Sequence, residues 1–303
     1  MSDHSVATPP RKNYFIPEID GLRGVATVGV VAQHLYGGYF LSHKLFVRGI
    51  DLTFITESGW LGVNLFFILS GFVLFLPYCS GQRELSQIDD LVGFYRHRAN
   101  RLLPAYYFSV LALIAIQGVT NIGWRQAFAL LTWTYPLSPD LYMPPANWSL
   151  WSIAAEVLFS LAFPALCIAT MRFGARRLLC VAIPISLIVR AFAHVYETHH
   201  VITMPEALFV GRADEFLWGF LAAEVYVHVP RLPWRKCLLP IGSAIVLASM
   251  VGFYLAVIDA IPKYWCAPLV TVLDFGLFLL ILSALFVKRL LARVLTAPPL
   301  MLI

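Results

Sequence analysis

Charged residues are scarce in this chain of 303 residues. Asp, Glu, Lys and Arg make up 13% of it, whereas hydrophobic residues make up 59%. Soluble domains hold about 25% charged residues and about 45–50% apolar ones. The shortage of charge therefore excludes an ordinary soluble domain and predicts a polytopic membrane protein.

Paired cysteines are also lacking. The five cysteines are scattered without a CxxC pair, and most lie in or beside apolar runs. We interpret them as small core residues rather than as a disulfide set or metal ligands. His194, His199 and His200 lie close together, but no carboxylate or cysteine stands at ligand spacing from them. We therefore expect no metal site.

The positive charge is distributed as in a membrane protein. The net charge is +5, and the Lys and Arg residues fall between apolar runs. This is the positive-inside pattern, so it does not indicate a nucleic-acid partner. Residues 1–18 are polar, with Arg11 and Lys12, and predict a disordered cytoplasmic tail. Residues 19–303 then form the transmembrane domain.

The apolar runs predict an all-α bundle of about eight transmembrane helices, with a cytoplasmic N-terminus. The Trp124–Tyr135 run has about twelve residues, fewer than the ~20 that a span needs, so we expect an interfacial or re-entrant segment there. The eight predicted spans are Ile19–Tyr36, Gly59–Leu76, Leu102–Val119, 150–166, Leu178–Val195, 216–229, Leu238–Val257 and Ala267–Val287.

The first predicted helix carries two polar groups that need an explanation. Arg23 and His34 are eleven residues apart, so on a helix they share one face and lie roughly 16 Å apart along the axis. Polar groups of this kind are costly in lipid and normally face a bundle interior or a wet cavity. Asp20 precedes them, either as an N-cap or as a functional carboxylate.

Three further groups stand out. Arg98 and Arg101 precede the third predicted span, where they either anchor it at the cytoplasmic face or bind phosphate at a helix start. Glu156 lies inside the fourth span and should meet a partner in the bundle interior. Arg212 and Asp214, before the sixth span, either pair locally or serve a site.

Five motifs occur in the order seen in the acyltransferase 3 family, which this chain resembles from about Asp20 to Ala223. They are DGLRG followed by His34, GVNLFFILSGF, RHRANRLLP, LWSIAAEVLFSLAFP and GRADEFLWG. The resemblance implies an integral-membrane O-acyltransferase of the bacterial inner membrane. Such an enzyme would move an acyl group, usually acetyl, from cytoplasmic acyl-CoA to a hydroxyl of a glycan, lipid or polyketide acceptor, without a tightly bound cofactor.

The same resemblance assigns residues to sites. The family's first-helix pair matches Arg23 and His34, and its tryptophan–serine motif with a downstream carboxylate matches Trp151, Ser152 and Glu156. Its basic motif before the third helix matches Arg98, Arg101 and Pro104. Beyond the position of Pro298–Ile303, members usually continue into a further helix with another histidine. That helix is not found here.

The residues themselves support acyl-transfer chemistry. A hydroxyl acceptor needs a base, and histidine titrates near neutral pH, so His34 is the best candidate. Glu156 is preferred to Asp20 as the carboxylate that orients its ring. Arg23, a few turns away, would then meet the donor's phosphates or pantetheine arm.

Two other classes stay open. A proton-coupled transporter would also place Arg, His and Glu in the membrane, but the chain lacks inverted repeats and paired broken helices. An inactive truncated membrane protein is the second alternative, because the family's final helix is not found.

Overall fold

The computed structural model describes residues 16–39, 46–48, 50–51, 55, 58–138, 140–144, 147, 149–196 and 208–287. Within these ranges the regular secondary structure is helical apart from one pair of two-residue strands, β1 (Phe46–Val47) and β2 (Ile50–Asp51). The long helices are α1 (Pro17–Tyr39), α3 (Gly62–Cys79), α4 (Ile88–Gln117), α7 (Leu150–Phe173), α8 (Ala175–Tyr196), α10 (Ala213–His228), α11 (Arg235–Val257) and α12 (Cys266–Phe286). The short ones are η1 (Gly59–Leu61), α5 (Val119–Ile122), α6 (Trp124–Thr132), η2 (Tyr135–Leu137), η3 (Phe209–Arg212) and η4 (Lys263–Trp265).

Among the described residues, six helical segments are long and apolar enough to cross a membrane, and they make this a multi-pass membrane protein. They are Gly59–Cys79, Ile88–Gln117, Leu150–Phe173, Ala175–His194, Arg235–Val257 and Lys263–Phe286. The first and sixth predicted spans form helices, α1 and α10, but are not in this set. Helix α10 has only 16 residues, and α1 carries polar residues among its apolar ones. The predicted total of about eight spans is therefore not confirmed.

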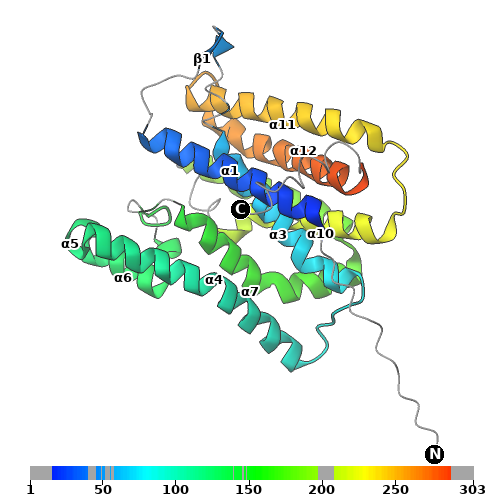
Figure 1. Cartoon of the computed structure of the whole chain (residues 1–303), viewed down its shortest axis with the longest axis horizontal. Helices are drawn as coiled ribbons and strands as arrows, with labels where there is room; N and C mark the ends of the chain where they lie inside the picture. Colours follow the sequence, from blue (N-terminus) through cyan, green and yellow to red (C-terminus); the bar gives the residue numbers. More distant parts are fainter. Residues whose placement is uncertain are drawn as a thin grey trace, which may run out of the picture.

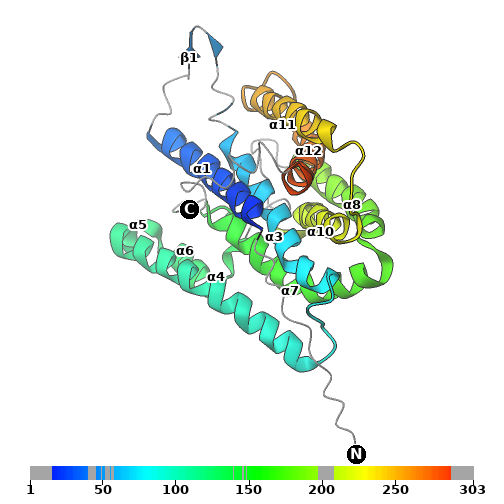
Figure 2. The same cartoon turned by 45° about the vertical axis from the view of Figure 1, so that its right-hand side comes forward.

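The bundle is layered (Figures 1 and 2). Helices α11 and α12 lie side by side along one edge, α1, α3 and α10 occupy the middle, and α7 and α4 lie below them. Helices α5 and α6 turn back beside the far end of α4. The Tyr106 hydroxyl of α4 donates to the Leu130 carbonyl of α6 at 2.6 Å, which fixes this short helix in place.

The centre of the bundle depends on a close approach of α3 and α10. A Cβ at Gly71 would lie 2.1 Å from the Phe216 carbonyl oxygen, and a Cβ at Gly219 would lie 2.0 Å from the Ile68 carbonyl oxygen. Only glycine leaves room for two backbones at this distance. Beside this contact Phe75 and Phe220 stack with their ring centroids 4.4 Å apart.

The basic connections share one end of the bundle. The α3–α4 and α10–α11 connections both lie at the right of Figure 1. The α7–α8 junction is there too, because the Ala175 backbone N–H donates to the Glu224 carboxylate near the end of α10 at 2.8 Å. These connections and the helix turns next to them carry Arg83, Arg172, Arg176, Arg177, Arg231, Arg235 and Lys236.

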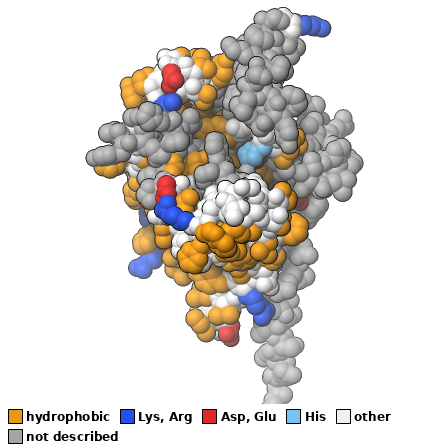
Figure 3. Space-filling model, turned by 90° about the vertical axis from the view of Figure 1, so that its left-hand side faces the viewer, with side chains coloured by type: hydrophobic (Ala, Val, Ile, Leu, Met, Phe, Trp, Pro, Cys, Tyr) orange, Lys and Arg blue, Asp and Glu red, His pale blue; other side chains and the backbone are white. Residues whose placement is uncertain are grey.

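The outer surface is apolar. Seen from the side of α5 and α6, hydrophobic side chains gather over much of the described surface and charged ones are few (Figure 3). Ile116 on α4 is 83% exposed, and Trp124 and Phe128 on α6 are 74% and 65% exposed. An apolar exterior of this kind suits contact with lipid.

Three expected boundaries were wrong. Helix α1 begins at Pro17, with proline in the first turn where its missing N–H costs nothing, so Asp20 lies inside the helix and is not its N-cap. The predicted tail therefore ends before residue 17, and its first fifteen residues lie outside the described residues. Helix α4 begins at Ile88, not near Leu102, because Gln87 and Asp90 form a capping box there.

Candidate functional site

A cavity of about 260 Å³ lies between α1, α3, α4 and α7. Its wall is mainly apolar and comes from Val30, Val63, Phe66, Phe67, Leu102 and Ile153. Five polar side chains also line it, those of Ser70, Arg98, Arg101, Ser152 and Glu156. A mostly apolar cavity with a few convergent polar groups is the usual form of a ligand site.

Arg98 and Glu156 form the central ion pair of this cavity. Their side chains are only 5% and 14% exposed, and an Arg98 guanidinium N–H donates to the Glu156 carboxylate. The same carboxylate oxygen accepts from the Ser70 hydroxyl at 3.0 Å, and Arg98 Nε donates to Ser160 Oγ at 2.9 Å. Glu156 thus finds the interior partner expected of it, but that partner is Arg98 and not the imidazole of His34.

The predicted phosphate clamp at a helix start does not exist in that form. Arg98 is ten residues into α4, about 15 Å from its first residue, so the surrounding backbone N–H groups belong to the helix interior. Arg101 follows one turn later and lines the cavity. Arg23 on α1 pairs with Asp20 at 3.3 Å and lies within electrostatic range of Arg101 and Glu156. Three arginines therefore converge here around one central carboxylate.

A second and larger cavity, of about 780 Å³, adjoins the first. Arg98 and Arg101 line both cavities, so the two share a wall at these side chains. The larger cavity lies between the end of α3 and the first turns of α4, at the end of the bundle that carries the basic connections. Its charged and polar lining residues are Gln82, Arg83, Glu84, Asp89, Asp90, Arg96, His97, Arg98, Asn100 and Arg101.

His34 stands at the other end of the smaller cavity. Val30, one turn earlier on α1, lines that cavity, and His34 itself is exposed. Its Nε2 is hydrogen-bonded to the Ser149 hydroxyl at the start of α7. Sequence reasoning singled out Trp151 and Ser152 near this point but missed Ser149, because the contact joins residues 115 positions apart.

Trp151 and Ser152 have different positions. Ser152 lines the cavity, and its hydroxyl donates to the Ser149 carbonyl at 2.9 Å. Trp151 is only 5% exposed and does not line the cavity. Its ring lies edge-on to Phe67, and the Arg212 guanidinium lies over it at 5.2 Å. Trp151 therefore stands behind the cavity wall.

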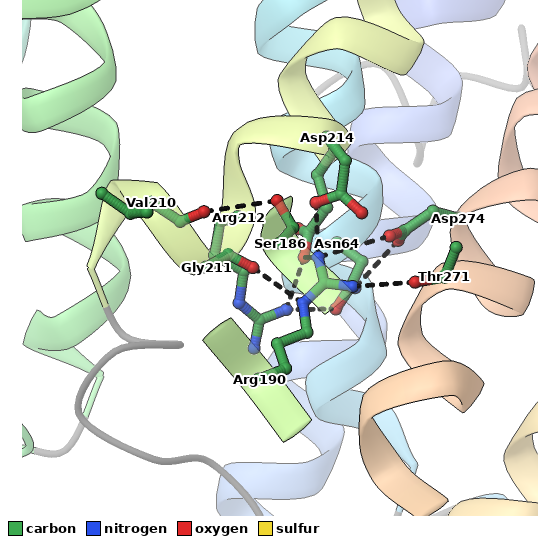
Figure 4. Close-up of polar contacts among 10 residues, drawn as sticks. Asn64, Ser186, Arg190, Val210, Gly211, Arg212, Asp214, Thr271 and Asp274 are labelled. Carbon is green, nitrogen blue, oxygen red and sulfur yellow. Dashed lines mark hydrogen bonds and ion pairs between the residues drawn. The ribbon is translucent and has the colours of Figure 1, made fainter. Parts of the chain in front are cut away.

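A buried charged network lies next to Trp151, whose ring faces the Arg212 guanidinium. Figure 4 shows the side chains of this network. Arg190 of α8, which sequence reasoning did not single out, is fully buried at its centre. Its guanidinium donates to the Gly211 carbonyl at 2.7 Å, to the Thr271 hydroxyl at 3.1 Å and to the Asp214 carboxylate at 2.5 Å. An arginine inside a predicted span was the signal available in the sequence.

Arg212 completes this network and is the residue that contacts Trp151. It donates to Glu215 at 2.7 Å and to the Asn64 side-chain oxygen at 3.4 Å, while the Asn64 amide donates to Asp274 at 3.0 Å. Asp214 pairs with Arg190, and Arg212 pairs with Glu215 three residues further on. Three carboxylates and two guanidinium groups here tie α3, η3, α8, α10 and α12 together.

The described part of the chain contains no group of three or more His, Cys, Asp or Glu side chains that could hold a metal ion. Within the same residues the five cysteines are free. His194 lies buried in α8, whereas His199 and His200 are outside the described residues.

Comparison of the sequence with known proteins shows which family the chain belongs to. The chain is 24% identical over 260 residues to the peptidoglycan O-acetyltransferase OatA of Listeria monocytogenes, a match that covers 79% of this chain and 39% of that protein. It is 27% identical over 179 residues to a putative O-acetyltransferase of Staphylococcus aureus strain COL, covering 52% of this chain and 26% of the relative. It is 26% identical over 164 residues to O-acetyltransferase OatA of Staphylococcus aureus strain NCTC 8325, covering 50% and 24%.

The chain thus spans about two fifths or less of the length of these curated relatives. No solved structure matches it. A single sequence-family match, described as an acyltransferase domain, extends over residues 16–298 and so includes every helix described above. The chain belongs to the acyltransferase 3 family.

Proposed function

We propose that the protein is a membrane O-acetyltransferase that takes an acetyl group from acyl-CoA and passes it to a hydroxyl of an envelope glycan. The observation that carries the proposal is the pair of cavities that meet at Arg98 and Arg101. The larger one is polar and the smaller one apolar. Acyl-CoA has a polyanionic head, a slender arm and a thioester at its tip. Its head would suit the polar cavity, and its arm and thioester would suit the apolar one.

The arginines suit the donor's phosphates. A guanidinium group presents several N–H donors in a fixed plane and binds phosphate in a bidentate manner. Four arginines line the larger cavity against three carboxylates, and Arg23 adds a positive charge near Arg101. In this proposal Arg98 and Arg101 hold the donor, while Glu156 fixes the direction of Arg98 through their ion pair.

The base is His34 in this proposal. It stands one turn beyond the cavity-lining Val30, so a thioester at the end of the apolar cavity would lie close to its ring. The exposure of His34 leaves room for an acceptor hydroxyl on the side away from the donor. Acceptor and donor would then approach the imidazole from opposite directions.

The orientation in the membrane is part of the proposal. The end with the basic connections would face the cytoplasm, where acyl-CoA is made, and the N-terminus would lie on that side. The His34 end would face the outside of a bacterial inner membrane. The acceptor class is suggested by the name of the Listeria relative, a peptidoglycan O-acetyltransferase.

The test uses inverted membrane vesicles from cells that make the full chain. Radiolabelled acetyl-CoA is added outside, and the glycan and lipid fractions are counted after a chase. Label should enter one of these fractions, and His34→Gln vesicles should lose it. Absence of label together with proton flux through the vesicles would instead identify a transporter.

A further inference from the structure

The hydrogen bond between His34 and Ser149 contributes to no step described so far. Ser149 is half-buried just before the first residue of α7. Its hydroxyl meets the Nε2 atom of the ring that would act as base. A nucleophile and its base within hydrogen-bond reach are the usual signature of covalent catalysis.

The pair lies where the acyl group would arrive. Val30 and Ser152 line the apolar cavity from opposite helices. His34 follows Val30 by four residues and Ser149 precedes Ser152 by three, so each stands one turn beyond a lining residue on the same face of its helix. The hydroxyl and the ring therefore meet at the end of the cavity, away from Arg98 and Arg101.

The backbone around Ser149 is held in place. Its N–H donates to the side-chain oxygen of Asn147 at 3.1 Å, and its carbonyl accepts from the Ser152 hydroxyl at 2.9 Å. These two contacts leave the Ser149 hydroxyl free to point at His34. A hydroxyl fixed in this way needs little reorganisation before it reacts.

We propose that Ser149 accepts the acyl group before the final acceptor does, so that the reaction passes through an acyl-serine. The proposal rests on the proposed function, since it takes the donor to be a thioester. His34 Nε2 removes the hydroxyl proton as Ser149 Oγ attacks the thioester carbonyl. The carbon–sulfur bond then breaks, and the leaving thiolate takes the proton from His34.

The second half reverses these roles. The acceptor hydroxyl gives its proton to His34 Nε2 and attacks the carbonyl of the acyl-serine. The bond between that carbonyl carbon and Ser149 Oγ breaks, and His34 returns the proton to Ser149 Oγ. The thiol leaves before the acceptor reacts, so the pantetheine arm need not share the cavity end with a bulky glycan.

The test is isotope exchange without an acceptor. The purified full chain, in lipid nanodiscs, is mixed with acetyl-CoA and tritiated CoA. An acyl-serine returns its acetyl group to the labelled thiol, so tritiated acetyl-CoA should form. Ser149→Ala and His34→Ala should each slow this exchange by about 100-fold or more. Acetyl transfer to a glycan acceptor should fall in parallel.

Two further variants test whether the loss of exchange is specific to the Ser149 nucleophile. Ser138→Ala is the matched control, because the Ser138 side chain makes no hydrogen bond with any described residue; its exchange should equal that of the wild type. Ser149→Cys retains a nucleophile and should still exchange. Its trapped acetyl group should leave with neutral hydroxylamine, as a thioester does, whereas the serine ester should need alkaline conditions.

The outcomes separate the two proposals. Acetyl transfer without exchange in the wild type, or exchange that survives Ser149→Ala, would overturn the acyl-serine and leave the proposed function standing. A wild type that neither exchanges nor transfers acetyl would overturn both.

Discussion

The ion pair between Arg98 and Glu156 gives a prediction whose size follows from the geometry. Glu156→Gln removes the negative charge but keeps the shape of the side chain. Arg98, with a side chain only 5% exposed, would then have only neutral acceptors for its charge, the new amide oxygen at position 156 and the Ser160 hydroxyl at 2.9 Å. Loss of one partner of a buried pair costs about 3–5 kcal/mol. At roughly 2 °C per kcal/mol for a chain of this size, the Tm should fall by about 6–10 °C.

A double variant tests whether the cost comes from the unpaired charge. Arg98→Gln combined with Glu156→Gln removes both charges and should be more stable than the sum of the single changes indicates, with a coupling energy of about 2 kcal/mol. Tryptophan fluorescence during a thermal scan in detergent measures all four proteins. The same scan reports the Kd for acyl-CoA if the Tm is followed as ligand is titrated.

Asp140→Asn is the matched control, because it breaks a second Arg–carboxylate pair that lies exposed on the surface. The Arg125 and Asp140 side chains are 70% and 55% exposed, and solvent screens such pairs. Its Tm should match that of the wild type. The reasoning is refuted if Glu156→Gln lowers the Tm no more than Asp140→Asn does, or if the double variant is no better than additive.

Three further predictions concern turnover, donor binding and packing. His34→Gln should lower acetyl transfer by about 10²–10⁴-fold with no change in Tm; near-normal transfer would show that the ring only packs. Arg101→Ala should raise the KM for acyl-CoA with little change in kcat, since phosphate contacts mainly supply uniform binding, and the opposite split would exclude this role. Gly71→Ala places a methyl group 2.1 Å from the Phe216 carbonyl and should cost about 1–3 kcal/mol or more in a thermal scan; Gly93→Ala, with no atom within 4 Å, should cost nothing.

The apolar runs were enough to predict most of the bundle. The spans expected over Gly59–Leu76, Leu238–Val257 and Ala267–Val287 are confirmed with ends within about four residues, whereas the span expected over 150–166 begins at Leu150 as predicted but continues to Phe173. Each of these segments is continuously apolar, and average hydropathy over a window is enough to identify such a segment as a membrane helix. The run at Trp124 was correctly predicted to be short, and α6 ends at Thr132.

The start of α4 could not be found in the same way. The basic residues from Arg96 to Arg101 were placed ahead of the third predicted span, as its anchor or as a phosphate site at a helix start, since charge interrupts an apolar run. They lie inside the helix because it extends past the apolar part, and Arg98 is neutralised by a carboxylate 58 residues away. The capping pattern at Gln87 and Asp90 was the local signal that marked the true start.

The partners within the site were beyond sequence reasoning. Ser149 meets His34 across 115 residues, and Asn64 meets Asp274 across 210. Helix packing decides which carboxylate meets which arginine, because a buried charge pairs with the opposite charge that packing brings near. Spacing along the sequence does not contain this information. A sequence identifies the costly groups but not their pairing.

The buried network around Arg190 has a consequence for how the chain enters the membrane during synthesis. Helix α8 leaves the ribosome with Arg190 six residues before its end at Tyr196, and an arginine without a partner inside a bilayer is costly, by up to about 2.5–3.5 kcal/mol at the centre on insertion scales. Its partners arrive later, Asp214 on α10 and Thr271 on α12. Helix α8 should therefore stay at the translocon until α12 has been made, so that the last described third of the chain inserts as one unit. A chain that stops after α11 should fail at this step and be degraded, although every one of its earlier helices is intact.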